Sequence, residues 1–155
     1  ADRMYRYFLR MLNYKAADAE DFTQELFAKL IEKPEAFDPS RRFSTWIYTL
    51  ASNMIKNEYR RRDRRLTIEP INGQEVPDSP DCWIEELDMP VVREYLALAV
   101  QNLDAKQRQC FLLRYESQRS IQEISEILDC PEGTVKSRIY YAVRKLSSQL
   151  KVLNE

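Results

Sequence analysis

Basic and hydroxyl-bearing side chains gather on one side of a predicted helix between residues 131 and 151. At about 100° per residue, the apolar side chains of the same segment fall on the opposite side. Arginine and lysine can hydrogen-bond guanine edges or phosphates, and serine and tyrosine can do either. This combination favours binding in a DNA major groove. The polar side consists of Lys136, Ser137, Arg138, Tyr140, Tyr141, Arg144 and Lys145.

The segment before this helix predicts a shorter helix and a tight turn. Ser120 and Glu123 have the spacing of a capping box, and isoleucine and leucine then recur at helical spacing. Asp129 and Cys130 interrupt the pattern, and Pro131 suits the first position of the next helix. Together the two helices predict a helix-turn-helix unit. The alternative is a helical hairpin whose basic outer face is only solvated.

A second basic region lies in residues 41–65, which hold eight basic and two acidic side chains. A helix is predicted from Ser44, its expected N-cap, to the end of this segment. A stripe of polar residues along it continues into a run of five arginines. The helix dipole and solvation would explain two arginines at a helix end. A run of five instead favours binding of a polyanion such as a nucleic acid. The stripe consists of Thr45, Thr49, Ser52, Asn53, Lys56 and Arg60, and the run consists of Arg60, Arg61, Arg62, Arg64 and Arg65.

The composition of the 155-residue chain indicates an all-α protein and argues against catalysis. Only two glycines occur, strand-like runs are missing, and good helix formers fill long stretches. Histidine, a common general base and metal ligand, is absent, and Cys82, Cys110 and Cys130 are far apart. We therefore expect no enzyme site, no metal and no cofactor. Scattered thiols fit the reducing cytoplasm, and no apolar run is long enough to insert into a membrane.

Charge and proline content divide the chain into two small helical domains. The first is predicted over residues 1–65 and the second over residues 91–155, with an acidic linker at 66–90. Residues 66–94 hold eight acidic side chains, one basic side chain and four prolines. The linker is interpreted either as a solvated tether or as an acidic strand that mimics nucleic acid inside a basic channel of a partner. One helical turn is expected near 82–87.

The remaining helices are read from apolar spacing and from capping residues. In the first domain we expect a helix over 3–14 and another from an N-cap at Asp18 to a stop before Pro34. In the second domain we expect one helix from about residue 91 and another opened by Asp104. Because the chain opens at residue 1 inside a helical pattern, we expect that an earlier segment was truncated.

Three segments of the chain carry a family resemblance. They are DAEDFTQELFAKL at 18–30, FSTWIYTLASNMIKNEYRRRDRR at 43–65 and GTVKSRIYYAVRKL at 133–146. In sequence and in order they resemble bacterial sigma factors of the extracytoplasmic-function (ECF) group in the sigma-70 family. The resemblance implies a transcription initiation factor that binds core RNA polymerase and directs promoter recognition and melting. It also implies duplex and single-stranded promoter DNA as partners, and control by an anti-sigma factor.

The resemblance further implies roles for individual residues. Contact with core polymerase is implied for Asp21, Gln24 and Glu25. Recognition of the minus-thirty-five promoter element is implied for Lys136, Ser137, Arg138, Tyr140, Tyr141 and Arg144. Recognition and melting of the minus-ten element are implied for Ser40, Arg41, Phe43, Ser44, Trp46, Asn53, Lys56, Arg60, Arg61 and Arg62.

Two other functions fit the residues alone. A stand-alone helix-turn-helix regulator with an N-terminal dimerisation domain would bind a palindromic duplex without polymerase. An adaptor that binds only proteins would show no salt-dependent affinity for DNA.

Overall fold

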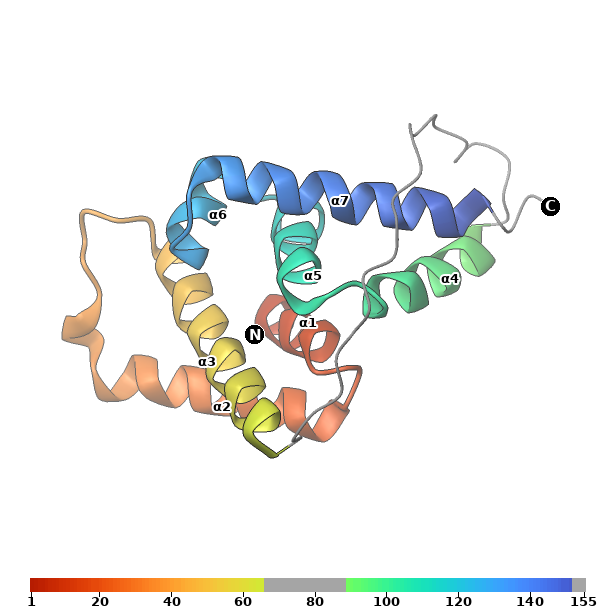
Figure 1. Cartoon of the computed structure of the whole chain (residues 1–155). Helices are drawn as coiled ribbons and strands as arrows, with labels where there is room; N and C mark the ends of the chain where they lie inside the picture. Colours follow the sequence, from red (N-terminus) through yellow and green to blue (C-terminus); the bar gives the residue numbers. More distant parts are fainter. Residues whose placement is uncertain (66–88, 152–155) are drawn as a thin grey trace.

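The computed structural model describes residues 1–65 and 89–151, and these form an all-α protein without strands in either range (Figure 1). Residues 66–88 of the predicted linker, with the helical turn expected near 82–87, lie outside the described residues. The first range holds α1 (Asp2–Met11), α2 (Ala16–Glu32), the short 3₁₀ turn η1 (Pro34–Ala36) and α3 (Phe43–Arg65). The second holds α4 (Met89–Gln101), α5 (Ala105–Phe111), the π turn η3 (Leu112–Glu116), α6 (Ile121–Leu128) and α7 (Glu132–Lys151).

The first three helices pack around the aromatic side chains of α1. Phe8 is fully buried and meets the ring of Phe22 from α2 at a centroid distance of 5.5 Å. Tyr7 meets the ring of Tyr48 from α3 at 5.7 Å, nearly edge-on. Such edge-to-face pairs add to the free energy of apolar burial. The apolar face predicted for the first helix is therefore the face that lies in the core.

Two predicted helix starts are wrong. Helix α2 begins at Ala16, with Lys15 at the N-cap position and no side-chain cap bond, so Asp18 lies inside the first turn. Helix α3 begins at Phe43, so Ser44 lies within the helix and is not its N-cap. Alanine is the strongest helix former, and the two alanines before Asp18 extend α2 backwards. Packing of an amphipathic face stabilises a helix more than a single cap, so α2 forms without one.

The capping signals of the second unit are confirmed. Asp104 precedes α5, and its Oδ1 atom accepts a hydrogen bond from the Gln107 amide at 3.0 Å. Before α6, the Glu123 amide donates to Ser120 Oγ, and the Ser120 amide donates to Glu123 Oε2, both at 3.1 Å. This reciprocal pair satisfies two amides that the helix cannot bond internally. It fixes the point at which the helix-turn-helix begins.

The turn between α6 and α7 depends on one residue in a left-handed conformation. Asp129 has φ 50° and ψ 55°, a conformation that aspartate tolerates better than most residues. Helix α7 begins at Glu132, one position after the predicted start at Pro131. The Pro131 carbonyl accepts from the Val135 amide at 3.1 Å, so this proline precedes the first helical residue.

The capping box gives a first stability prediction. Ser120→Ala is expected to lower the free energy of unfolding by about 1 kcal/mol, because the Glu123 amide loses its acceptor. Chemical denaturation followed by circular dichroism measures this difference. Ser148→Ala is the control, since Ser148 is exposed on α7. Equal stability of the two variants would contradict the capping role.

The two helical units pack against each other. In Figure 1, α6 lies beside α3, and α5 lies over α1, as the residue contacts also show. Gln109 Nε2 donates to the Tyr7 hydroxyl at 2.8 Å, and that hydroxyl lies 3.0 Å from Ser52 Oγ. Arg108, only 7% exposed, donates to Asn13 Oδ1 at 3.1 Å. Buried polar contacts of this kind require a defined geometry, so they specify one arrangement of the two units.

Candidate nucleic-acid interface

The outer side of α7 presents most of the predicted minus-thirty-five residues to solvent. Tyr140 and Tyr141 are 51% and 46% exposed, and their ring centroids lie 5.4 Å apart. Arg144 Nη1 donates to the Tyr140 hydroxyl at 3.3 Å and lies over the same ring. Lys136 is exposed one turn earlier. The inner side holds the helix in the core through Val135, Ile139, Ala142 and Leu146.

Two other predicted residues of α7 are already engaged within the protein. Ser137 is exposed, and its hydroxyl donates to the Gly133 carbonyl at 3.0 Å. Arg138 is half-buried, and its Nη1 atom lies 3.8 Å from Cys130 Sγ. Burial raises the pKa of the neighbouring Cys110 thiol to about 11, although Arg138 acts in the opposite direction. Cys110 is therefore a protonated core residue at neutral pH.

The predicted minus-ten residues near the start of α3 surround an aromatic cluster. The rings of Phe37, Phe43 and Trp46 lie 5.0 to 5.8 Å apart, and Phe43 remains 53% exposed. Beside them, the Ser40 amide and hydroxyl donate to Asp38 Oδ1 at 2.9 and 2.7 Å. These two bonds hold the pKa of the Asp38 carboxyl below its usual value, so Asp38 stays ionised and keeps accepting both bonds. An exposed aromatic surface on a fixed turn can stack against an unpaired base.

The arginine run at the end of α3 is partly neutralised by internal carboxylates. Glu58 Oε1 accepts from Arg61 at 2.8 Å and from Arg62 at 2.9 Å. Arg61 and Arg62 keep the pKa of Glu58 below its usual value, with Arg61 the stronger influence. Arg62 also lies 3.5 Å from Asp18 of α2, which joins the two helices. Arg60 is exposed on α3 and lines the cleft between α3 and the second unit.

Part of the predicted polar stripe on α3 is covered by the second unit. Ser52 is only 3% exposed because it lies beneath the bonded pair of Gln109 and Tyr7. Further along, α3 and the second unit enclose a cleft of about 500 Å³. Its lining includes Asn53, Lys56 and Arg60 of α3 together with Lys106 and Arg138. The structure therefore brings residues predicted for two different promoter elements to one shared space.

Known proteins share both halves of this architecture. Residues 1–65 match sigma-70 region 2, and residues 93–146 match sigma-70 region 4. Over 153 residues the chain is 34% identical to the ECF RNA polymerase sigma factor SigL of Mycobacterium tuberculosis. The aligned segment covers 97% of this chain and 84% of SigL. The chain belongs to the ECF RNA polymerase sigma factors.

Other ECF sigma factors are similar over nearly the whole chain. SigW of Bacillus subtilis is 32% identical over 163 residues, covering 98% of this chain and 85% of that protein. Among solved structures, the sigma factor RpoE in complex with the anti-sigma factor NepR from Bartonella quintana has a TM-score of 0.72 and 26% identity. That likeness covers 96% of this chain and 90% of the other. It therefore includes region 2 and region 4 together.

The residues predicted to bind polymerase lie on α2 of this ECF sigma factor, outside α3 and α7. Asp21, Gln24 and Glu25 are exposed and share one side of α2. Glu25 Oε1 lies 2.8 Å from Lys29 Nζ, an exposed pair that leaves both charges accessible to solvent. In the described residues, no helix is long and apolar enough to cross a bilayer. Those residues also contain no group of three potential metal ligands among histidine, cysteine, aspartate and glutamate.

Sequence reasoning missed several residues that organise this ECF sigma factor. Phe37 belongs to the aromatic cluster near the start of α3, and the sequence signal for it was an isolated aromatic residue between Pro34 and Pro39 in a polar loop. Arg108 and Gln109 join region 4 to region 2. No periodicity distinguishes them from neighbouring polar residues.

Proposed function

We propose that region 2 of this chain recognises and melts the minus-ten element while region 4 reads the minus-thirty-five element. The exposed tyrosine pair and Lys136 on α7 carry this proposal, because they form a polar surface on an element that matches sigma-70 region 4. Lys136, Tyr140, Tyr141 and Arg144 contact the major groove. In region 2, Phe43 and Trp46 stack on an unpaired base, with Ser40, Arg41 and Ser44 beside them. Asn53, Lys56 and Arg60 to Arg62 contact the adjoining strands.

The partners of the chain follow from its family. Asp21, Gln24 and Glu25 contact core RNA polymerase, leaving α3 and α7 available to the promoter. The similar RpoE was solved in complex with an anti-sigma factor, which supports an anti-sigma partner for this chain. The protein acts in the cytoplasm without catalysing a reaction, and residues 66–90 connect the two regions on polymerase. Joining two weak contacts in one complex raises their effective concentration.

The arrangement of the two regions must open for this function. A cleft of about 500 Å³ suits a small molecule rather than a DNA duplex, whose major groove alone is about 12 Å wide. Asn53, Lys56 and Arg60 face this cleft opposite Arg138. We therefore infer that the described arrangement is a closed state, which must open before these residues can contact two separate promoter elements. Polymerase and promoter bind the open state and shift the population toward it.

Run-off transcription on promoter templates of randomised sequence tests the function. Core RNA polymerase with the purified chain is expected to initiate from a defined subset of templates, which polymerase alone does not select. Sequencing the transcribed templates should show two enriched elements at a fixed spacing, because each region reads one of them. Transcription without enrichment would contradict the proposal, and one palindromic element bound without polymerase would favour a stand-alone regulator.

The role of α7 gives a narrower prediction. Lys136→Ala is expected to weaken binding to a selected minus-thirty-five duplex about tenfold, in line with the loss of one charged contact. Lys15→Ala is the matched control, because it removes the same charge from an exposed position outside α7. Fluorescence anisotropy with polymerase-bound protein measures both. An equal loss for both variants would show general electrostatic attraction rather than a contact from α7.

A further inference from the structure

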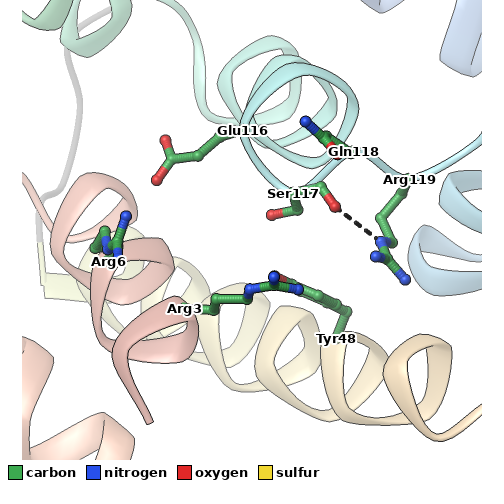
Figure 2. Close-up of a pocket in the computed structure, with 7 residues that line it drawn as sticks. All are labelled: Arg3, Arg6, Tyr48, Glu116, Ser117, Gln118 and Arg119. Carbon is green, nitrogen blue, oxygen red and sulfur yellow. Dashed lines mark hydrogen bonds between the residues drawn. The ribbon is translucent and has the colours of Figure 1, made fainter.

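A second pocket between the two regions lies away from the cleft lined by the predicted DNA contacts. Its walls are α1 and α3 of region 2 and the segment joining η3 to α6 in region 4, and its volume is about 320 Å³ (Figure 2). Three guanidinium groups line it, those of Arg3, Arg6 and Arg119. In Figure 2, Arg3 and Arg6 project from α1, and Arg119 comes from the segment that precedes α6. None of these arginines belongs to the predicted polymerase or promoter contacts.

The pocket has an excess of positive charge. Its one carboxylate, Glu116, lies 2.7 Å from Arg10 Nε and is neutralised by it. Within the described residues, Arg3 and Arg6 form no hydrogen bond or ion pair and are exposed. Both are therefore available to an external anion.

Arg119 is held in position before any ligand arrives. Its Nε atom donates to the Ser117 carbonyl at 3.0 Å, and its guanidinium lies 5.8 Å from the centre of the Tyr48 ring. The same Nε atom also forms an ion pair with Glu123 Oε2 at 3.8 Å, which further fixes the guanidinium. A guanidinium with its orientation fixed loses little entropy when it binds an anion. The Ser117 hydroxyl and the Gln118 amide supply further donors at the same wall.

We propose that this pocket binds the phosphate groups of a small polyanion. Guanidinium forks match phosphate oxygens and can bind them in pairs. The pocket volume lies at the lower end of the range of about 300–1,000 Å³ for small-molecule sites. A nucleobase would find no exposed stacking surface, because Tyr48 is only 4% exposed. Recognition therefore depends on the phosphates, whether they are inorganic or carried by a nucleotide.

The site is complete only when region 2 and region 4 are together. Arg3 and Arg6 come from region 2, and Arg119 comes from region 4. A ligand that contacts all three binds the closed state alone and stabilises it by mass action. The binding site does not depend on the proposed function. Its consequence, competition with promoter binding, does depend on it.

Isothermal titration calorimetry of the chain with sodium tripolyphosphate tests the site, in magnesium-free buffer with ionic strength held constant by sodium chloride. Arg3→Gln with Arg6→Gln is expected to weaken binding at least about tenfold, and Arg119→Gln is expected to do the same. The matched control is Lys15→Gln with Lys33→Gln, which removes the same charge from exposed positions of region 2 outside the pocket and outside the predicted DNA contacts. Its affinity should match that of the unchanged protein. The melting temperature without ligand verifies that each variant is folded.

Each other outcome overturns a defined part of the proposal. An equal loss in the control double variant would assign binding to the general basic surface. Full affinity after Arg119→Gln would show that the ligand does not join the two regions. ATP should bind about as tightly as tripolyphosphate, and adenosine should not bind. Binding of ATP without binding of tripolyphosphate would require base recognition and overturn the phosphate assignment. Failure of transcription with intact tripolyphosphate binding would refute the proposed function but leave this site standing.

Discussion

Charge reversal at Asp21 and Glu25 is expected to lower the affinity of the chain for core RNA polymerase about a hundredfold, equal to about 2.7 kcal/mol. Both carboxylates are exposed on one side of α2, where they can meet a basic partner surface. Replacing each by lysine places like charges opposite one another, which costs several kcal/mol in a protein interface. Promoter-specific transcription should fall in parallel at low protein concentration and recover as the concentration is raised.

The control for this prediction reverses two other exposed carboxylates. Glu35→Lys with Glu94→Lys changes the net charge by the same amount at positions outside α2. The Glu25–Lys29 pair is exposed, so its loss contributes little to stability and should leave the fold intact. Affinity for polymerase can be measured by anisotropy of labelled protein. If both double variants bind equally well, the polymerase contact is not on this side of α2.

The sequence predicted the helices and their buried faces better than their first residues. Periodicity placed Phe8 and Val135 in the core, and both are fully buried. Capping signals located α5 and α6, since Asp104 and Ser120 stand directly before strong apolar patterns. At Asp18 a good cap residue followed alanines, and helix propensity extended α2 past it. A capping residue therefore marks the start of a helix only when the residues before it are not strong helix formers.

The relation between the two regions could not be predicted from periodicity. A polar residue such as Ser52 has the same pattern whether it faces solvent or another domain, yet it is buried against Gln109 through the Tyr7 hydroxyl. Arg138 was grouped with exposed basic residues, but it lies half-buried in the cleft beside Cys130. Periodicity records that a face is polar without showing what that face contacts. The candidate site residues were therefore identifiable by type, while their accessibility was not.

Arg108→Ala is expected to lower the free energy of unfolding by about 3 kcal/mol, because several buried acceptors lose their donor at once. Arg108 Nη2 donates to the carbonyls of Gln101 and Leu103 at 2.8 and 3.0 Å, which closes the end of α4. Its Nη1 donates to Asn13 and reaches the Tyr59 hydroxyl at 3.5 Å, which joins region 4 to region 2. Within the described residues the buried Arg108 Nε atom has no hydrogen-bond partner, and the cost of burying it offsets part of the stability that Arg108 provides.

The control for Arg108 is a neighbour of the same charge on the same helix. Lys106→Ala removes an exposed cation from α5 and should change stability by less than about 0.5 kcal/mol. Arg108→Lys separates charge from geometry, because a lysine ammonium cannot bond both carbonyls and Asn13 as the guanidinium fork does. It should therefore lose nearly as much stability as Arg108→Ala in chemical denaturation. Full stability of Arg108→Lys would mean that positive charge alone, not the forked contact, holds the two regions in the closed state.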